Sequence, residues 1–174
     1  MNVFVTGGLG YIGSHTCVEL VQAGHQVVIA DNLSNSRLSV LAAIETITGQ
    51  RPDFYRADVC DKAALREIFA AHAFDAVLHF AGLKAVNESC SMPLAYYRNN
   101  LDATLSLLEV MEEFGCKRLV FSSSATVYGP ENPIPYAETM PAHVATNPYG
   151  WTKVMIEQLL RDYAAARPDF SAVL

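Results

Sequence analysis

The sequence has few charged residues, no cluster of basic ones and no long apolar run. Only 17% of its 174 residues are charged, and the formal net charge is −6. Because no patch of Lys and Arg is available to follow a phosphate backbone, we expect no nucleic-acid partner. No 18 apolar residues follow one another, and no basic flank precedes an apolar segment at the N-terminus. We therefore expect no membrane partner and a cytoplasmic location.

Patterns typical of metal and disulfide sites are also missing. The four cysteines show no C-x-x-C spacing, and the five histidines show no ligand spacing. We therefore expect reduced thiols, structural or surface histidines, and no metal. The sequence also lacks the G-x-S-x-G turn of many hydrolases and the G-K-[ST] loop of nucleoside triphosphatases. The central motif of each of these two enzyme classes is therefore missing.

The sequence does contain a regular alternation of two kinds of segment. Short β-branched runs alternate with longer stretches of helical period, which is typical of βαβ units. With 51% apolar residues, the chain can form one domain over residues 1–174. We predict an α/β fold, a Rossmann-type doubly wound parallel sheet with helices on both faces. The predicted strands are Val3–Thr6, Val27–Asp31, Asp53–Arg56, Ala76–Phe80 and Arg118–Ser122, and the predicted helices are Ile12–Ala23, Ser39–Thr48, Lys62–Ala71, Pro93–Phe114 and Tyr149–Ala166.

Glycine and proline mark where these elements end. Gly24, Gly49 and Gly115 stand where helix C-caps are expected. Five prolines between residues 129 and 148 predict an irregular connection over the surface, on the substrate side. Residues 170–174 form a further apolar run, which predicts a sixth strand that stops before any loop follows. A short edge strand is the alternative.

A glycine-rich segment follows the first predicted strand directly. Gly8, Gly10 and Gly13 satisfy G-x-G-x-x-G, and strand, glycines and helix occur in the order that a dinucleotide site requires. The free N–H groups of the helix can then bind a pyrophosphate, and we expect position 10 to tolerate no side chain. Such glycines can also serve packing alone.

An acidic residue ends the second predicted strand. Asp31 follows Gly13 by 18 residues, where a carboxylate accepts hydrogen bonds from an adenosine ribose and repels a 2′-phosphate. This spacing favours NAD over NADP. The alternative is a strand-end Asp that caps a turn together with Asn32.

A Tyr–Lys pair begins the last predicted helix. Tyr149 and Lys153 stand four residues apart, so their side chains share one helix face. An ammonium beside the phenol, reinforced by a cationic nicotinamide, would stabilise the phenolate, so that Tyr149 can accept a proton from a substrate hydroxyl. An amphipathic surface pair is the alternative.

Three serines follow the fifth predicted strand, where a hydroxyl could reach the same reacting oxygen. They are Ser122, Ser123 and Ser124. The competing interpretation is that they satisfy local backbone groups, and it fits Ser122 best.

Taken together, five blocks resemble the UDP-glucose 4-epimerases, which belong to the extended short-chain dehydrogenase/reductase family. The blocks are Thr6–His15, Asp31–Leu33, Phe80–Lys84, Ser122–Gly129 and the Tyr149/Lys153 pair. The resemblance covers essentially the whole chain, with Asn87 standing where the family usually has Gly. Family members continue past the position of Leu174 into a smaller domain with most sugar-nucleotide contacts. The resemblance therefore implies an NAD-binding domain without its C-terminal partner domain.

The resemblance also implies the roles of individual residues. It assigns the NAD pyrophosphate to Gly7, Gly10, Tyr11, Ile12 and Gly13. It assigns the adenosine ribose to Asp31, Asn32, Leu33, Ser34, Asn35 and Ser36, and the adenine to Asp58 and Val59. It assigns the remaining cofactor path to Phe80, Ala81, Gly82, Lys84 and Asn99, with further contacts from Ser122, Tyr149 and Lys153. The implied catalytic residues are Ser124, Tyr149 and Lys153.

The implied reaction is the interconversion of UDP-glucose and UDP-galactose through NAD-mediated oxidation and re-reduction at sugar C4. One alternative is an NAD-binding module with little or no turnover. Another is a nucleotide-sugar 4,6-dehydratase, which carries an Asp-Glu pair after the fifth strand. Ser123, Ser124 and Ala125 include no acid, which argues against elimination. A third is a remnant that does not fold stably.

Two predicted helices carry more apolar side chains than one packing stripe needs. They are residues 93–114 and 149–166. A two-fold contact that pairs both helices would bury the surplus, so we expect a homodimer through them, as the resemblance also implies. The alternative is that the surplus packs between the two helices of one subunit.

Overall fold

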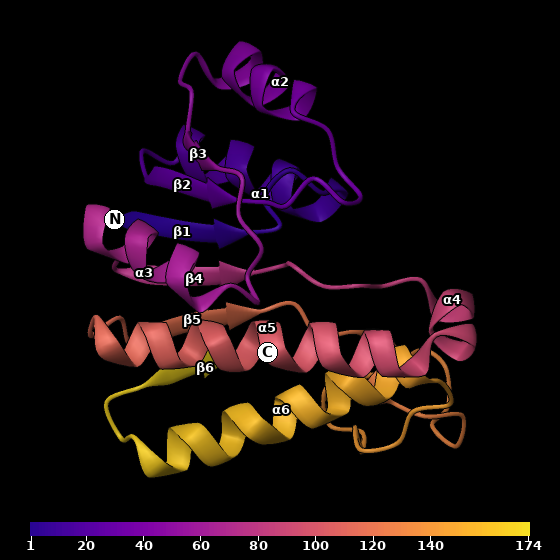
Figure 1. The fold of residues 1–174 in the computed structure, drawn as a ribbon. Coiled ribbons are helices and arrows are strands. Elements are labelled where there is room, and N and C mark those ends of the chain that lie inside the picture. The colour runs from indigo at the N-terminus through magenta and orange to yellow at the C-terminus, as the bar shows by residue number, and fades with distance from the viewer.

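Six parallel strands form one sheet in the computed structural model, which describes residues 1–174 (Figure 1). Their order across the sheet is β3-β2-β1-β4-β5-β6, the order of a Rossmann fold. The predicted fold class is therefore confirmed. The strands are β1 Asn2–Thr6, β2 Gln26–Ala30, β3 Asp53–Tyr55, β4 Ala76–His79, β5 Arg118–Phe121 and β6 Ser171–Val173.

Six helices connect the strands. All five predicted helices are present, with bounds that agree to within one residue. The short helix α4 and the 3₁₀ turn η1 were not predicted. None of the helices is long and apolar enough to span a bilayer. The helices are α1 Tyr11–Gln22, α2 Ser39–Thr48, α3 Lys62–Ala71, α4 Val86–Ser91, α5 Pro93–Glu113 and α6 Pro148–Ala166, and η1 is Ala125–Val127.

The predicted end signals are confirmed. Gly24, Gly49 and Gly115 follow the ends of α1, α2 and α5 with φ of 82°, 74° and 71°, a conformation that glycine adopts without a Cβ clash. Residues 129–147 contain no helix or strand, as their prolines predict. Residues 171–173 pair with β5 as a short strand at the sheet edge.

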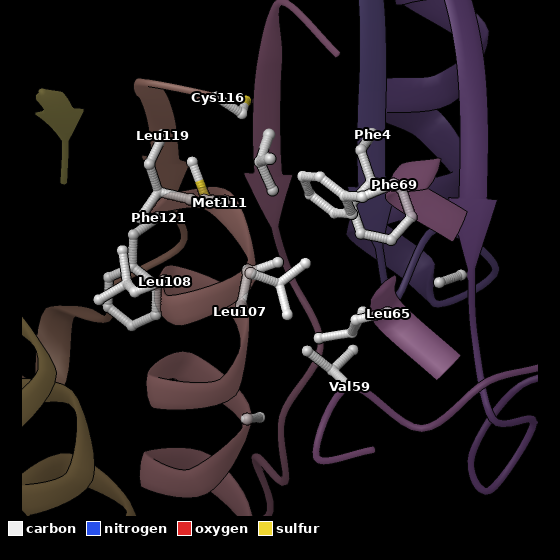
Figure 2. Close-up of a cluster of buried hydrophobic side chains, with 14 of the residues drawn as sticks. Phe4, Val59, Leu65, Phe69, Leu107, Leu108, Met111, Cys116, Leu119 and Phe121 are labelled. Atoms are coloured by element: carbon white, nitrogen blue, oxygen red, sulfur yellow. The ribbon is translucent and has the colours of Figure 1, made fainter. Parts of the chain in front are cut away.

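Alternating side chains of the strands build a core on each face of the sheet. On β1, Val3 and Val5 face the helices α1 and α2, whereas Phe4 faces the other side. The larger core packs Phe4 against Phe69 of α3 and continues through Leu107 of α5 to α6 (Figure 2). Because both faces of the central strands are covered, their middle residues are apolar, as expected for parallel strands.

Candidate active site

The carboxyl ends of all six strands lie at one edge of the sheet, because the strands are parallel. The strand order reverses between β1 and β4, and ligands of such sheets bind in the crevice at this point. The predicted site residues follow the strands at this edge or lie on α5 and α6 beside it. The structure thus brings them to one side of the molecule (Figure 1).

At two positions of the loop after β1, neighbouring backbone atoms leave room only for glycine. A Cβ on Gly7, where φ is 68°, would lie 2.7 Å from the backbone nitrogen of Ala81, and a Cβ on Gly13 would lie 2.3 Å from the carbonyl oxygen of Gly7. The loop therefore approaches both α1 and the segment after β4 at backbone distance. A Cβ on Gly10 would meet only the Gly7 carbonyl, at 3.3 Å. The protein itself thus does not impose the strict requirement that we expected at position 10.

The N-terminus of α1 is open for an anion. Gly10 is the N-cap residue, no side chain caps the helix, and its first turn has no acidic residue. The first-turn N–H groups of a helix have no intrahelical acceptor, so those of Tyr11, Ile12 and Gly13 are available to an anion such as a pyrophosphate. This arrangement fits the diphosphate of a dinucleotide.

Asp31 joins the glycine loop to the loop after β2. Its buried carboxylate accepts the N–H groups of Leu9 at 3.1 Å and Leu33 at 2.9 Å, and the hydroxyl of Ser36 at 2.7 Å. Leu33 has a φ of 61°, which is strained for a leucine and is held by this bond. Asp31 therefore caps a turn at Leu33, and Asn32 caps the next residue by accepting the N–H of Ser34 at 3.0 Å, as the alternative proposed. Ser34 and Asn35 lie exposed in the same loop.

Residues after β3 lie next to the Asp31 loop at this edge of the sheet. Asp58 accepts the Asn32 amide at 3.0 Å and the Cys60 N–H at 2.9 Å. Partial burial raises the pKa of Asp58, but these hydrogen bonds outweigh burial and hold the pKa below its ordinary value. Val59 is buried in the core, and the Asn99 carbonyl accepts from the Cys60 thiol at 3.5 Å. The two predicted adenine residues thus follow β3 directly, next to the Asp31 loop.

A buried asparagine that we did not predict fixes the loop after β4. The side chain of Asn100 accepts the N–H of Leu83 at 2.8 Å and donates to the Leu83 carbonyl at 3.0 Å. It also donates to Thr152 on α6 at 3.0 Å. Asn100 therefore holds the loop of Phe80, Ala81, Gly82 and Lys84 against the helix that carries the Tyr–Lys pair. Its role depends on contacts between distant segments, so no local sequence pattern marks it.

The start of α6 is set by its own residues. The side chain of Asn147 caps the helix by accepting the N–H of Gly150 at 2.8 Å, and Pro148 occupies the first helical position. Tyr149, half-buried, thus lies in the first turn, and Lys153 lies one turn later.

Lys153 is buried and points at the end of β5. Only 7% of it is exposed, and its Nζ donates to the carbonyl of Ser122 at 2.7 Å. Nζ lies 4.5 Å from the ring centre of Phe121 and 5.8 Å from that of Tyr149. Burial lowers the pKa of Lys153 to about 8. These contacts exclude the alternative of a surface Tyr–Lys pair, since the ammonium faces the protein interior.

Ser124 lies close to the same helix. Its Oγ accepts the N–H of Thr126 at 3.3 Å and the hydroxyl of Thr126 at 3.0 Å, which leaves its own proton for another acceptor. The Thr126 hydroxyl would lie 3.1 Å from a Cβ on Gly150, so Ser124 is joined to the first turn of α6 through one residue. Ser122 contributes its backbone carbonyl to Lys153 on α6. The contact with a local backbone group that the competing interpretation expected of Ser122 is made instead by Ser124, with the N–H of Thr126.

A Rossmann sheet with an open helix N-terminus at its switch point is the fold of dinucleotide-binding proteins. Comparison with protein families gives the same class. Residues 3–174 match the model of the NAD dependent epimerase/dehydratase family. The chain belongs to this family.

Proteins similar to this chain include several UDP-glucose 4-epimerases. Those of Yersinia pestis and Bacillus subtilis are both 53% identical over the entire chain. Among solved structures, the UDP-glucose 4-epimerase of Bifidobacterium longum in complex with NAD+ and UDP has a TM-score of 0.98 at 46% identity, with 100% of this chain covered. The enzyme of Stenotrophomonas maltophila, with bound NAD and formylated UDP-arabinopyranose, has a TM-score of 0.95 at 52% identity, with 99% of this chain covered. The chain spans about half the length of these relatives, between 51% and 52%.

Proposed function

We propose that residues 1–174 form the NAD-binding domain of a UDP-glucose 4-epimerase, which interconverts UDP-glucose and UDP-galactose. The observation that carries this proposal is the position of Lys153, buried beside Tyr149 and anchored at the end of β5. It is supported by relatives of that name at 53% identity.

The residues present fit NAD. The α1 N-terminus offers unpaired N–H groups to the pyrophosphate, and Gly10, where the protein leaves space, allows close approach. The Asp31 carboxylate lies at the end of β2, where it can accept the ribose hydroxyls and would repel a 2′-phosphate. NAD, when bound, supplies the acceptor and later the donor of the hydride at sugar C4.

The chain's own residues then handle the proton. Tyr149 accepts the proton of the C4 hydroxyl as the hydride leaves, and the buried charge of Lys153 stabilises the resulting phenolate. Ser124 donates its free hydroxyl proton to the same sugar oxygen. A dehydratase would need an acid at this position. The nearest buried acid after β5, Glu157, is already bound to Ser123 and Arg161, which favours epimerisation over elimination.

Two measurements test the proposal. Calorimetry on the 174-residue chain is expected to show NAD binding and weaker NADP binding. A coupled assay on the chain extended to the length of its relatives is expected to show epimerisation, with a loss of about a hundredfold or more in Tyr149→Phe. Equal activity in that variant would contradict the role of Tyr149. NAD binding without turnover in the 174-residue chain would support the alternative of a binding module for that length.

We also propose that two copies associate through α5 and α6, which lie side by side in Figure 1. Part of the apolar surplus is used within the subunit, because Leu108, Met111, Ile156 and Leu160 are buried. Leu105 and Met155 remain 43% and 44% exposed. They line a groove of about 520 Å³ between the two helices, and a second copy would cover it.

A further inference from the structure

Glu157 is a buried acid beside the proposed catalytic residues, and the proton transfer described above does not use it. It lies on α6 one turn after Lys153, and only 5% of it is exposed. Because burial of an unpaired carboxylate is strongly unfavourable, such a side chain must have polar partners. Those partners indicate what Glu157 holds in place.

The two oxygens of Glu157 serve different elements. Oε2 accepts Nη2 of Arg161, on the same helix, at 2.8 Å, and the Arg161 side chain is 44% exposed. Arg161 therefore supplies a compensating charge from the solvent side. Oε1 accepts the hydroxyl of Ser123 at 2.5 Å, which joins α6 to the segment that leaves β5. This segment also carries Ser124.

The chain turns sharply at this point. β5 ends at Phe121. The N–H of Ser122 still bonds to the His79 carbonyl of β4 at 3.2 Å, and the N–H of Ser123 returns to the Phe121 carbonyl at 3.1 Å, so the chain leaves the sheet ladder from Ser123 onward. Helix α6 then holds two consecutive residues with side chains one turn apart. Lys153 donates to the carbonyl of Ser122, and Glu157 accepts from the hydroxyl of Ser123.

We propose that Glu157 is a positioning residue that fixes the turn after β5 through Ser123, so that the Ser122 carbonyl anchors the Lys153 ammonium beside Tyr149. The inference rests on the proposed function, because it concerns the same Tyr–Lys pair. The Ser123 hydroxyl and the Glu157 carboxylate act as one unit. Loss of either therefore frees the Ser122 carbonyl from its place against Nζ of Lys153.

Exchange of the Lys153 ammonium protons with water tests this anchor directly. It is measured by NMR on the 174-residue chain labelled with ¹⁵N in lysine. A buried, hydrogen-bonded ammonium exchanges slowly, and the other three lysines, none of which is buried, serve as internal references. We expect Ser123→Ala to accelerate exchange at Lys153 by about tenfold, as expected for the loss of one hydrogen bond. Ser123→Thr retains a hydroxyl and is expected to restore slow exchange.

Two further variants keep the test decisive. Glu157→Gln keeps the volume and offers a weaker acceptor, so it is expected to fold and to accelerate exchange less than Ser123→Ala. Arg161→Gln removes only the outer partner and is expected to leave exchange unchanged. If Ser123→Ala and Glu157→Gln lower the melting temperature without changing Lys153 exchange, or if Arg161→Gln accelerates it equally, Glu157 is merely structural. The readout needs no turnover, so its failure is distinct from an absence of epimerase activity.

Discussion

Lys153 differs from the other lysines of the chain because its charge is buried and lowers the stability of the fold. Lys62 and Lys117 have side chains that are 40% and 54% exposed and pair with acids at the surface, and Lys84 is exposed. Lys153 has only a carbonyl and two aromatic rings around its ammonium. A buried ammonium without an acidic partner can stabilise a neighbouring phenolate, but it is unfavourable for folding. The site is therefore less stable than one without this charge.

The pH dependence of stability measures that cost. Burial lowers the pKa of Lys153 to about 8 from its ordinary value of 10.5, so between these pH values the unfolded chain binds more protons than the folded one. Stability therefore rises with pH through this range. Relative to Lys153→Met, which does not titrate, we expect the wild type to gain about 2 kcal/mol of unfolding free energy between pH 7 and 9.5. Urea unfolding at both pH values measures it, and a constant difference would contradict the burial of the charge.

Gly13 and Gly10 separate the requirements of the fold from those of the ligand. Gly13→Ala forces a Cβ to within 2.3 Å of a backbone oxygen, so we expect it to lower the free energy of unfolding by about 1–3 kcal/mol. Gly10→Ala meets only a contact of 3.3 Å and is expected to cost less than about 1 kcal/mol. It is nevertheless expected to weaken NAD binding, because the new methyl group faces the pyrophosphate. Thermal melts and calorimetry on both variants check this. Unchanged NAD affinity in Gly10→Ala would show that the pyrophosphate does not bind against this loop.

At the scale of elements, a chain of buried polar groups links β1, β4 and α5. His79 lies between the hydroxyls of Thr6 at 2.7 Å and Thr104 at 3.2 Å, and Thr104 donates to the Asn100 carbonyl. Because Thr104 uses its proton on that carbonyl, Nε2 of His79 is the donor and Nδ1 accepts from Thr6. The expectation of a structural histidine is confirmed, and the neutral ring aligns the two strands that flank the cofactor crevice.

This histidine makes the fold sensitive to acid. Burial, with a smaller contribution from the charge of Lys153, lowers the pKa of His79 to about 3. The unfolded chain takes up a proton near pH 6.5 and the folded chain does not, so stability falls as pH falls. Relative to His79→Gln, we expect the wild type to lose about 2 kcal/mol between pH 7.5 and 5. Parallel denaturant titrations of both proteins check this, and identical losses would show that His79 can be protonated in place.

The sequence predicts the long helices well and the short ones poorly. The helical period needs several turns to be visible, so α5 and α6 are predicted to within one residue, whereas the six residues of α4 and the three of η1 are too short. The same limit applies to the site. Gly13, Asp31, Tyr149 and Lys153 have recognisable spacing along the chain. Asn100, Asn147 and Glu157 act through hydrogen bonds whose partners only the fold brings near, or through a cap that resembles any other.

At the scale of the whole molecule, the groove between α5 and α6 predicts self-association. We expect light scattering to give the mass of a dimer at micromolar concentration, and Met155→Glu, which places a charge in the groove, to give a monomer. Ile47→Glu, at a position that is 61% exposed on α2, is the matched control and is expected to remain dimeric. A monomer mass for the wild type, with or without NAD, would contradict the proposed dimer. The cytoplasmic location and the absence of nucleic-acid and membrane partners stay predictions.

The central place of β1 in the sheet has a consequence for the synthesis of the chain. β1 is complete after six residues, and its first neighbour, β2, is complete at residue 30, but its second neighbour, β4, is made only by residue 79. Until then an apolar strand has one open edge, which is available to other nascent chains. A ribosome that pauses before this point would hold an aggregation-prone polypeptide. The second edge of β1 therefore stays unpaired until about half of these residues have been made.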